Sequence, residues 1–235
     1  MRTRSGESVS TRRAPVVAID GPSGSGKSTL ARGLATRLGF IHIDTGAMYR
    51  VVGLRAAEVG VGIRDDEALG RLCDRLAIRF DRRDGQVRVL EGGRDVTDDI
   101  RRPEVSRLAS DVSTNPSVRR ALVEMQRAMG CEGGVVLDGR DIGTVVFPDA
   151  EVKIYLDAEV DERARRRTAE LAERGTPEDP RATLAAMIER DRQDSTRSEA
   201  PLRPAPDAVH FDSTRLDADT VLARAIELVR RFTDS

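Results

Sequence analysis

The stretch Gly21-Pro22-Ser23-Gly24-Ser25-Gly26-Lys27-Ser28 decides the fold. It matches the phosphate-binding pattern G-x-x-x-x-G-K-[ST] at every fixed position. The apolar run Pro15–Asp20 precedes it and predicts a buried parallel strand. Residues 28–38 follow with leucine at every fourth position, which predicts a helix, and Gly39 marks its end. This motif binds phosphate when it forms a turn between a strand and a helix. We therefore reject the alternative interpretation, a glycine-rich turn without a ligand.

The motif also predicts the chemistry of its residues. Backbone N–H groups of the turn converge on phosphate oxygens, and the helix N-terminus adds a favourable partial charge. Lys27 is expected to reach the β- and γ-phosphates, and the Ser28 hydroxyl is expected to bind Mg²⁺. We therefore predict a site for ATP with Mg²⁺, formed by nine consecutive residues: Gly21, Pro22, Ser23, Gly24, Ser25, Gly26, Lys27, Ser28 and Thr29.

Strands and helices alternate along most of the chain. This alternation predicts an α/β fold in which helices cover both faces of a central parallel sheet of five strands. The further strands are expected at 40–44, 135–138, 151–156 and 208–212, and the further helices at 46–59, 116–129, 159–174, 180–196 and 217–232. Residues 62–100 differ, because a short helix (65–76) leads into a β-hairpin around Asp84-Gly85 and a strand near 95–97. That stretch predicts a small inserted α+β subdomain.

Length and composition exclude several classes of protein. The 235 residues suit one domain, and no apolar run is long enough to cross a bilayer. The basic N-terminus lacks an apolar stretch, so we expect no secretory signal. The net charge of −1 and an aromatic content of 3% argue against nucleic-acid binding. With only two cysteines, we expect a cytoplasmic protein without nucleic-acid or membrane partners.

The phosphate-binding motif alone does not say how the nucleotide is used. The N-K-x-D and D-x-x-G motifs of a GTPase switch are not found, and the chain is too short for a large motor or transporter ATPase. A small kinase remains. Only two of the 39 basic residues are lysines, so arginines are expected to hold most of the anions that the protein binds.

Two further segments indicate which kinase this is. Asp44–Arg50 (DTGAMYR) follows the second expected strand, and Leu137–Pro148 (LDGRDIGTVVFP) follows the third. Together with the phosphate-binding motif they closely resemble the bacterial cytidylate kinases, which phosphorylate CMP and dCMP. The resemblance extends from about residue 15 to the C-terminus and includes the insertion within residues 62–105. It implies ATP and CMP or dCMP as substrates, giving CDP or dCDP, and our default expectation is a monomer.

The resemblance also implies a division of the chain. Residues 1–13 are small, polar and basic, which predicts a disordered tail, and the resemblance implies a kinase domain over residues 14–235. The domain divides into a core (14–46, 104–158 and 183–235), a region that binds the nucleoside monophosphate and carries the insert (47–103), and a short helical lid (159–182).

Arginines near the acceptor have a chemical reason. Donor and acceptor are both anionic, so positive charge must neutralise the acceptor phosphate and the transferring group. Arg50 lies one turn into the helix after the second expected strand, and Arg140 lies just past the end of the third, where an open α/β sheet binds ligands. By resemblance, Arg50, Arg140 and Arg197 hold the acceptor phosphate, although any single arginine in this chain is also open to interpretation as a surface residue. The predicted catalytic set is Lys27, Arg50, Asp138 and Arg140.

Cytosine carries an amino donor where uracil carries a carbonyl, and a carboxylate pairs with the first and repels the second. We predict that Asp141 is this carboxylate. The resemblance adds Ser110 and Arg119 on the base, with Thr45 where many members of the family have serine. Asp138 is interpreted as a carboxylate that acts on Mg²⁺ through water; the alternative is an aspartate that only forms a turn.

Two helical faces carry the remaining candidates. Arg190, Asp194 and Arg197 share one face, which is either a surface salt-bridge stripe or, by resemblance, part of the acceptor site with Arg190 and Asp194 on the sugar. Arginines of the expected lid are predicted to contact the phosphates of ATP, without a choice among them: Arg163, Arg166, Arg167 and Arg174. His42, His210 and both cysteines are interpreted as structural.

Two alternatives remain open from the sequence. One is a kinase for another small acceptor, such as UMP, AMP or shikimate. The other is a binding module that senses ATP without catalysing a reaction.

Overall fold

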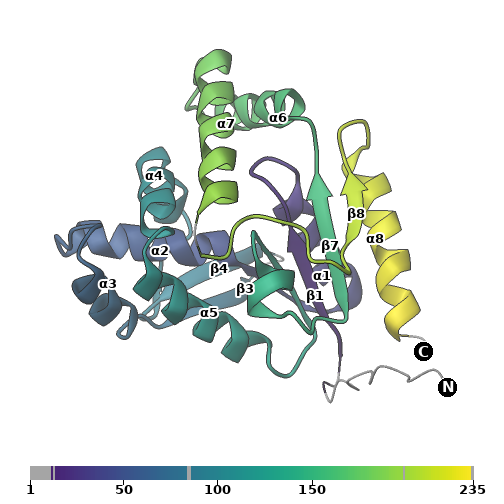
Figure 1. The fold of residues 1–235 in the computed structure, drawn as a ribbon, viewed down its shortest axis with the longest axis horizontal. Helices are drawn as coiled ribbons and strands as arrows, with labels where there is room; N and C mark the ends of the chain where they lie inside the picture. Colours follow the sequence, from purple (N-terminus) through teal and green to yellow (C-terminus); the bar gives the residue numbers. More distant parts are fainter. Residues whose placement is uncertain (1–11, 13, 84–85, 198, 234–235) are drawn as a thin grey trace.

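The centre of the molecule is a parallel sheet of five strands in the order β2-β6-β1-β7-β8 (Figure 1). The structure is a computed structural model that describes residue 12 and residues 14–83, 86–197 and 199–233. The predicted sheet is confirmed, and its strands are β1 (Val16–Asp20), β2 (Ile41–Asp44), β6 (Val135–Gly139), β7 (Val152–Asp157) and β8 (Val209–Asp212).

Helices cover both faces of this sheet. One face packs against α1 (Lys27–Leu38) and α8 (Ala218–Thr233), and the other against α2 (Thr45–Glu58) and α5 (Pro116–Gly130). In β1, alternate side chains point to opposite faces, so Val17 and Ile19 join the first core and Val16 and Ala18 join the second. A strand buried on both faces explains why residues 15–20 read as an apolar run.

β1 lies between β6 and β7, and all three run parallel. In this register Asp20, the last residue of β1, pairs with Gly139, the last residue of β6. The chain leaves both strands at the same edge of the sheet. Figure 1 shows that this edge faces α6 (Val160–Glu173) and α7 (Pro180–Thr196). Ligands of open α/β sheets bind at this edge.

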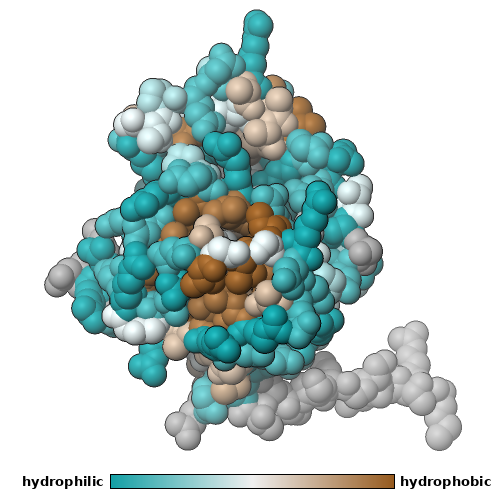
Figure 2. Space-filling model, turned by 90° about the vertical axis from the view of Figure 1, so that its left-hand side faces the viewer, coloured by the Kyte–Doolittle hydropathy of each residue, from teal (hydrophilic) through white to brown (hydrophobic). Residues whose placement is uncertain are grey.

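The predicted insert forms a three-stranded antiparallel sheet beside the main one. The β-hairpin is confirmed, although its turn at 84–85 lies outside the described residues. Figure 2 shows apolar side chains gathered on the face that carries α3, and a groove beside this helix is lined in part by Val59, Val61 and Leu72. The elements are α3 (Asp66–Cys73), β3 (Ile78–Arg83), β4 (Gln86–Glu91), β5 (Arg94–Asp95), a short 3₁₀ turn (Asp99–Arg101) and α4 (Pro103–Val112).

The expected strand near 95–97 is present as β5, which begins one residue earlier and is shorter. β5 ends at Asp95, because the Thr97 hydroxyl accepts the N–H of Val89 at 2.9 Å and so replaces a backbone acceptor. Helix α4 was not predicted, nor was the single turn of π-helix at Ile142–Val146.

The expected tail falls mostly outside the described residues, which leave out 1–11 and 13. Arg12 is described, and it forms ion pairs with Asp149 at 2.7 Å and Glu151 at 3.2 Å. Among the helices in the described ranges, none is long and apolar enough to span a membrane.

Candidate active site

The phosphate-binding loop joins β1 to α1 in a conformation that requires glycine. Gly21 has φ 149°, and a Cβ there would lie 2.0 Å from the carbonyl oxygen of Leu156. Gly26, directly before the helix, has φ 94°. These torsions turn the backbone tightly into the helix N-terminus, which is the geometry that binds phosphate.

Lys27 is buried at the first position of α1. Its Nζ donates to the carbonyl oxygen of Pro22 at 2.5 Å and lies 3.4 Å from the Ser25 hydroxyl. Burial lowers the pKa of Lys27 well below its usual value, and the charge of Arg140 lowers it further. The ammonium group is thus held inside the loop without a carboxylate ion-pair partner among the described residues, as a cation that binds phosphate requires.

Asp138 connects this loop to β2. One carboxylate oxygen accepts the Ser28 hydroxyl at 2.7 Å, and the other lies 2.7 Å from Nε2 of His42. Burial alone would raise the pKa of Asp138, but the hydrogen bonds from His42 and Ser28 keep it below its usual value. An ionised carboxylate therefore sits beside the Ser28 hydroxyl. His42 has a polar partner in the core, in agreement with its interpretation as a structural residue.

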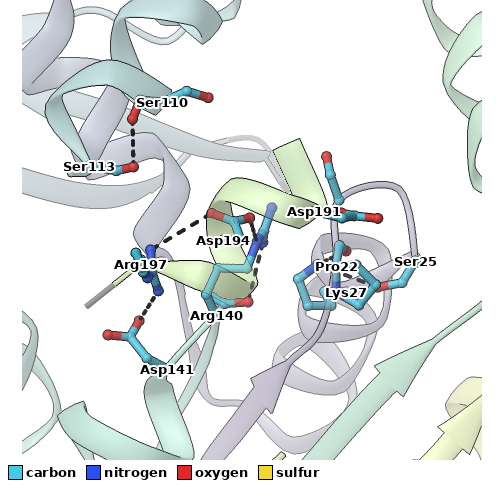
Figure 3. A network of polar contacts seen from close by, with 12 residues as sticks. Pro22, Ser25, Lys27, Ser110, Ser113, Arg140, Asp141, Asp191, Asp194 and Arg197 are labelled. Carbon is cyan, nitrogen blue, oxygen red and sulfur yellow. Dashed lines mark hydrogen bonds and ion pairs between the residues drawn. The ribbon is translucent and has the colours of Figure 1, made fainter. Parts of the chain in front are cut away.

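Four predicted acceptor residues form one network beside this loop (Figure 3). Arg140 donates from Nε to Asp194 at 2.8 Å. Arg197 lies between two carboxylates, 3.8 Å from Asp194 and 3.9 Å from Asp141. Burial raises the pKa of Asp194, but the charges of Arg140 and Arg190 outweigh this and hold it below its usual value. The helical face of α7 thus points into the site and is not a solvated surface stripe.

Asp141 and Arg119 form a buried ion pair at 2.5 Å. Arg119 also donates to the Tyr49 hydroxyl at 3.4 Å, and burial raises the pKa of Tyr49 to about 12. Ser110 lies in α4, where its hydroxyl donates weakly to the carbonyl oxygen of Ser106 at 3.4 Å. No ion pair or hydrogen bond joins the Ser110 side chain to Asp141 within the described residues.

Arg50 and Thr45 lie at the start of α2. Asp44 caps this helix by accepting the N–H of Ala47 and also accepts from Arg50 at 2.9 Å. Thr45 donates to the carbonyl oxygen of Asp138 at 2.7 Å, so its hydroxyl ties α2 to β6. The cap by Asp44 and the hydrogen bond from Thr45 to β6 therefore fix the first turn of α2, and with it the position of the Arg50 backbone.

The site carries more positive charge than its carboxylates neutralise. Burial, together with the charge of Arg140, lowers the pKa of Arg190 to about 10. Nε of Arg50 and Nη2 of Arg197 are buried and donate no hydrogen bond to any described residue. An anionic ligand would neutralise these mutually repelling cations, and it would accept hydrogen bonds from the donors that lack a partner.

The arginines of the expected lid differ in their contacts. Arg163 is buried and donates to the carbonyl oxygen of Ser23 at 3.0 Å and to Asp191 at 2.7 Å. Arg166 donates to Glu162 and to Ser213, whereas Arg167 pairs only with Glu170 among the described residues.

Sequence reasoning missed several residues of this site. Asp191 pairs with Arg163 across two helices, and Tyr49 contacts Arg119 across a separation of 70 residues. The one signal available for Asp44 was its position before Thr45-Gly46, which is typical of a helix cap.

The site therefore has two parts, the phosphate-binding loop and a largely buried cluster of arginines and carboxylates, which meet at the ends of β1 and β6. Residues 17–231 match the family model described as cytidylate kinase. The chain belongs to the cytidylate kinase family.

Curated relatives agree over nearly their whole length. The cytidylate kinase of Geobacter sulfurreducens is 53% identical over 223 residues, which cover 95% of this chain and 96% of the relative. The cytidylate kinase of Geobacter sp. (strain M21) is 54% identical and covers 92% of each chain. The cytidylate kinase of Salmonella arizonae is 46% identical and covers 94% of this chain and 97% of its own.

Lys27→Ala tests the loop. We expect kcat to fall by about 10²–10³-fold, because a preorganised cation at the transferring phosphoryl group is lost. Stability should not fall, because burying the ammonium group is itself unfavourable. Steady-state kinetics with CMP and thermal unfolding measure the two effects, with the exposed Arg37→Ala on the same helix as the control. Unchanged turnover in a folded Lys27→Ala protein would contradict this assignment.

Proposed function

We propose that this protein transfers the γ-phosphate of ATP to CMP or dCMP, giving ADP and CDP or dCDP. The observation that carries the proposal is the buried Asp141–Arg119 pair next to the arginine cluster. It supplies a carboxylate for the cytosine amino group beside a pocket for phosphate. Membership of the cytidylate kinase family supports the same substrate.

Phosphoryl transfer requires positioning and charge neutralisation more than covalent chemistry by the protein. An oxygen of the acceptor's 5′-phosphate forms a bond to the γ-phosphorus, and the bond from that phosphorus to the β,γ-bridging oxygen breaks as ADP leaves. In this proposal residues Gly21–Thr29 bind the phosphates of ATP and Lys27 stabilises the charge that develops on them. Arg50, Arg140 and Arg197 neutralise the acceptor phosphate.

The residues present fit Mg²⁺. The Ser28 hydroxyl and the ionised Asp138 carboxylate are oxygen ligands 2.7 Å apart at the N-terminus of α1. Mg²⁺ is held in such sites by one or two protein oxygens together with substrate phosphates. We propose Ser28 as the direct ligand, with Asp138 acting through water. When bound, the ion would neutralise charge on the phosphates of ATP.

We assign recognition of the nucleoside to residues that contact the base and residues that contact the sugar. Asp141, oriented by Arg119, accepts a hydrogen bond from the cytosine amino group, with Ser110 and Thr45 nearby on the acceptor side. Asp194 and Arg190 contact the sugar.

We propose the same division of the domain as the resemblance implies: a core over 14–46, 104–158 and 183–235, an acceptor-binding region over 47–103 and a lid over 159–182. Within the lid, the candidates for binding ATP are Arg163, Arg166 and Arg167.

Arg167 is the lid arginine best suited to reach phosphate. Its partner Glu170 is exposed on the same helix, so that ion pair is cheaply exchanged for one with an anion. Arg163 instead supports the loop from behind through Ser23. We propose a cytoplasmic location, because the donor is ATP and the thiols of Cys73 and Cys131 are free, and we keep a monomer as the default.

A panel of acceptors tests the proposed function. With ATP and Mg²⁺, we expect CMP and dCMP to exceed UMP, AMP, GMP and shikimate by at least about tenfold in kcat/KM, since a carboxylate that matches cytosine repels uracil. Coupled release of ADP measures this. Faster turnover of AMP or GMP would contradict the proposal, and ATP binding without any turnover would favour an ATP-sensing module.

Asp141→Asn tests the base contact. An amide presents a donor to the carbonyl of uracil, so the ratio of kcat/KM for CMP over UMP should fall by about one to two decades. Kinetics with both nucleotides measure the ratio, and thermal unfolding separates it from loss of the pair with Arg119. The exposed Asp98→Asn is the control. If the ratio keeps its wild-type value in a folded variant, another residue reads the base.

A further inference from the structure

Asp20 is the last residue of β1 and directly precedes the phosphate-binding loop. Its carboxylate is buried, with 3% of the residue exposed, yet it contacts neither Lys27 nor Ser28 through a hydrogen bond among the described residues. It points across the sheet edge instead. One oxygen accepts the N–H of Ile142 and the other accepts the N–H of Gly143, both at 2.8 Å.

The two N–H groups belong to the turn that follows Asp141. Asp141 itself has φ −147° and ψ 24°, outside the helical region, and the π-helical turn begins at the next residue. Two short bonds to two oxygens of one carboxylate fix both the position and the orientation of this turn. The direction in which the Asp141 side chain leaves the backbone therefore depends on Asp20.

Lys153 packs against the same turn at Gly143. A Cβ at Gly143 would lie 3.2 Å from Cδ of Lys153, whose ammonium group is held by Asp207 at 2.7 Å and by the carbonyl oxygen of Pro148. Burial raises the pKa of Asp20 to about 7 even though both N–H donors act against the rise, and these donors favour the charged form that accepts both hydrogen bonds.

We infer that Asp20 is a positioning residue for recognition of the acceptor base: it holds the turn that presents Asp141 to the pyrimidine. The inference rests on the proposed function. Because Asp20 adjoins Gly21 in sequence, one strand end would fix both the phosphate-binding loop for the donor and the base contact for the acceptor.

The alternative is that Asp20 only stabilises the fold. Asp20→Asn distinguishes the two, because an amide has one acceptor and one donor, and its NH₂ group would face the N–H of Ile142 or Gly143. A displaced turn should weaken CMP binding and the choice between CMP and UMP. Loss of stability alone would lower all activities together and leave that choice unchanged.

The experiment uses the full chain and begins with wild-type protein, whose preference for CMP over UMP tests the proposed function independently. For Asp20→Asn we expect KM for CMP to rise about tenfold and the CMP/UMP ratio of kcat/KM to fall about fivefold or more, with KM for ATP within about twofold. Asp217→Asn is the control, because the Asp217 carboxylate also accepts a backbone N–H, that of Thr220, and Asp217 is not among the proposed site residues.

Gly143→Ala is the second variant, used where Asp20→Asn yields too little folded protein. It keeps Asp20 but adds a Cβ that would lie 3.2 Å from Cδ of Lys153 and 3.4 Å from Oδ2 of Asp20, which crowds the contact between Asp20 and the turn, so the same selective loss is expected. An unchanged CMP/UMP ratio in whichever variant folds, or equal losses for CMP, UMP and ATP, would overturn the inference while leaving the proposed function standing.

Discussion

The parallel pairing of β1 with β6 is the constraint on which the rest of the site depends. It sets Asp20 beside Gly139, so the phosphate-binding loop and the turn at 138–143 leave the sheet as neighbours. The hydrogen bonds Ser28–Asp138 and Asp20–Gly143 cross between them. A slip in this register would separate the loop from Asp138 and Asp141, even with every residue of the motifs intact.

Electrostatics then explains the composition of the arginine cluster. Arg50 and Arg140 pair with the carboxylates of Asp44 and Asp194, whereas burial lowers the pKa of both Arg190 and Arg197. A small number of paired carboxylates keeps these side chains ordered, and the excess of positive charge favours a phosphate-bearing ligand. Guanidinium groups suit this role because they remain charged when buried.

The sequence predicted the sheet and the phosphate-binding loop because local patterns carry them: an apolar run, fixed glycines and leucines at helical spacing. The chemistry of cytosine identified Asp141, and the family resemblance added Arg119 as a residue on the base. Neither predicted that the two side chains form a buried ion pair. Contacts such as Arg163 to Ser23 depend on how α6 packs on the loop, which no spacing encodes. Helix α4 was recognisable, since Pro103 stands at its first position and Val105, Ala109 and Val112 share its buried face.

The most direct test of this account is a crystal structure of the protein with CMP, Mg²⁺ and a non-hydrolysable ATP analogue. The account predicts the cytosine amino group within hydrogen-bond distance of Asp141, with the acceptor phosphate among Arg50, Arg140 and Arg197 and opposite Lys27. A structure in which CMP binds with its base away from Asp141, or its phosphate away from those three arginines, would contradict it.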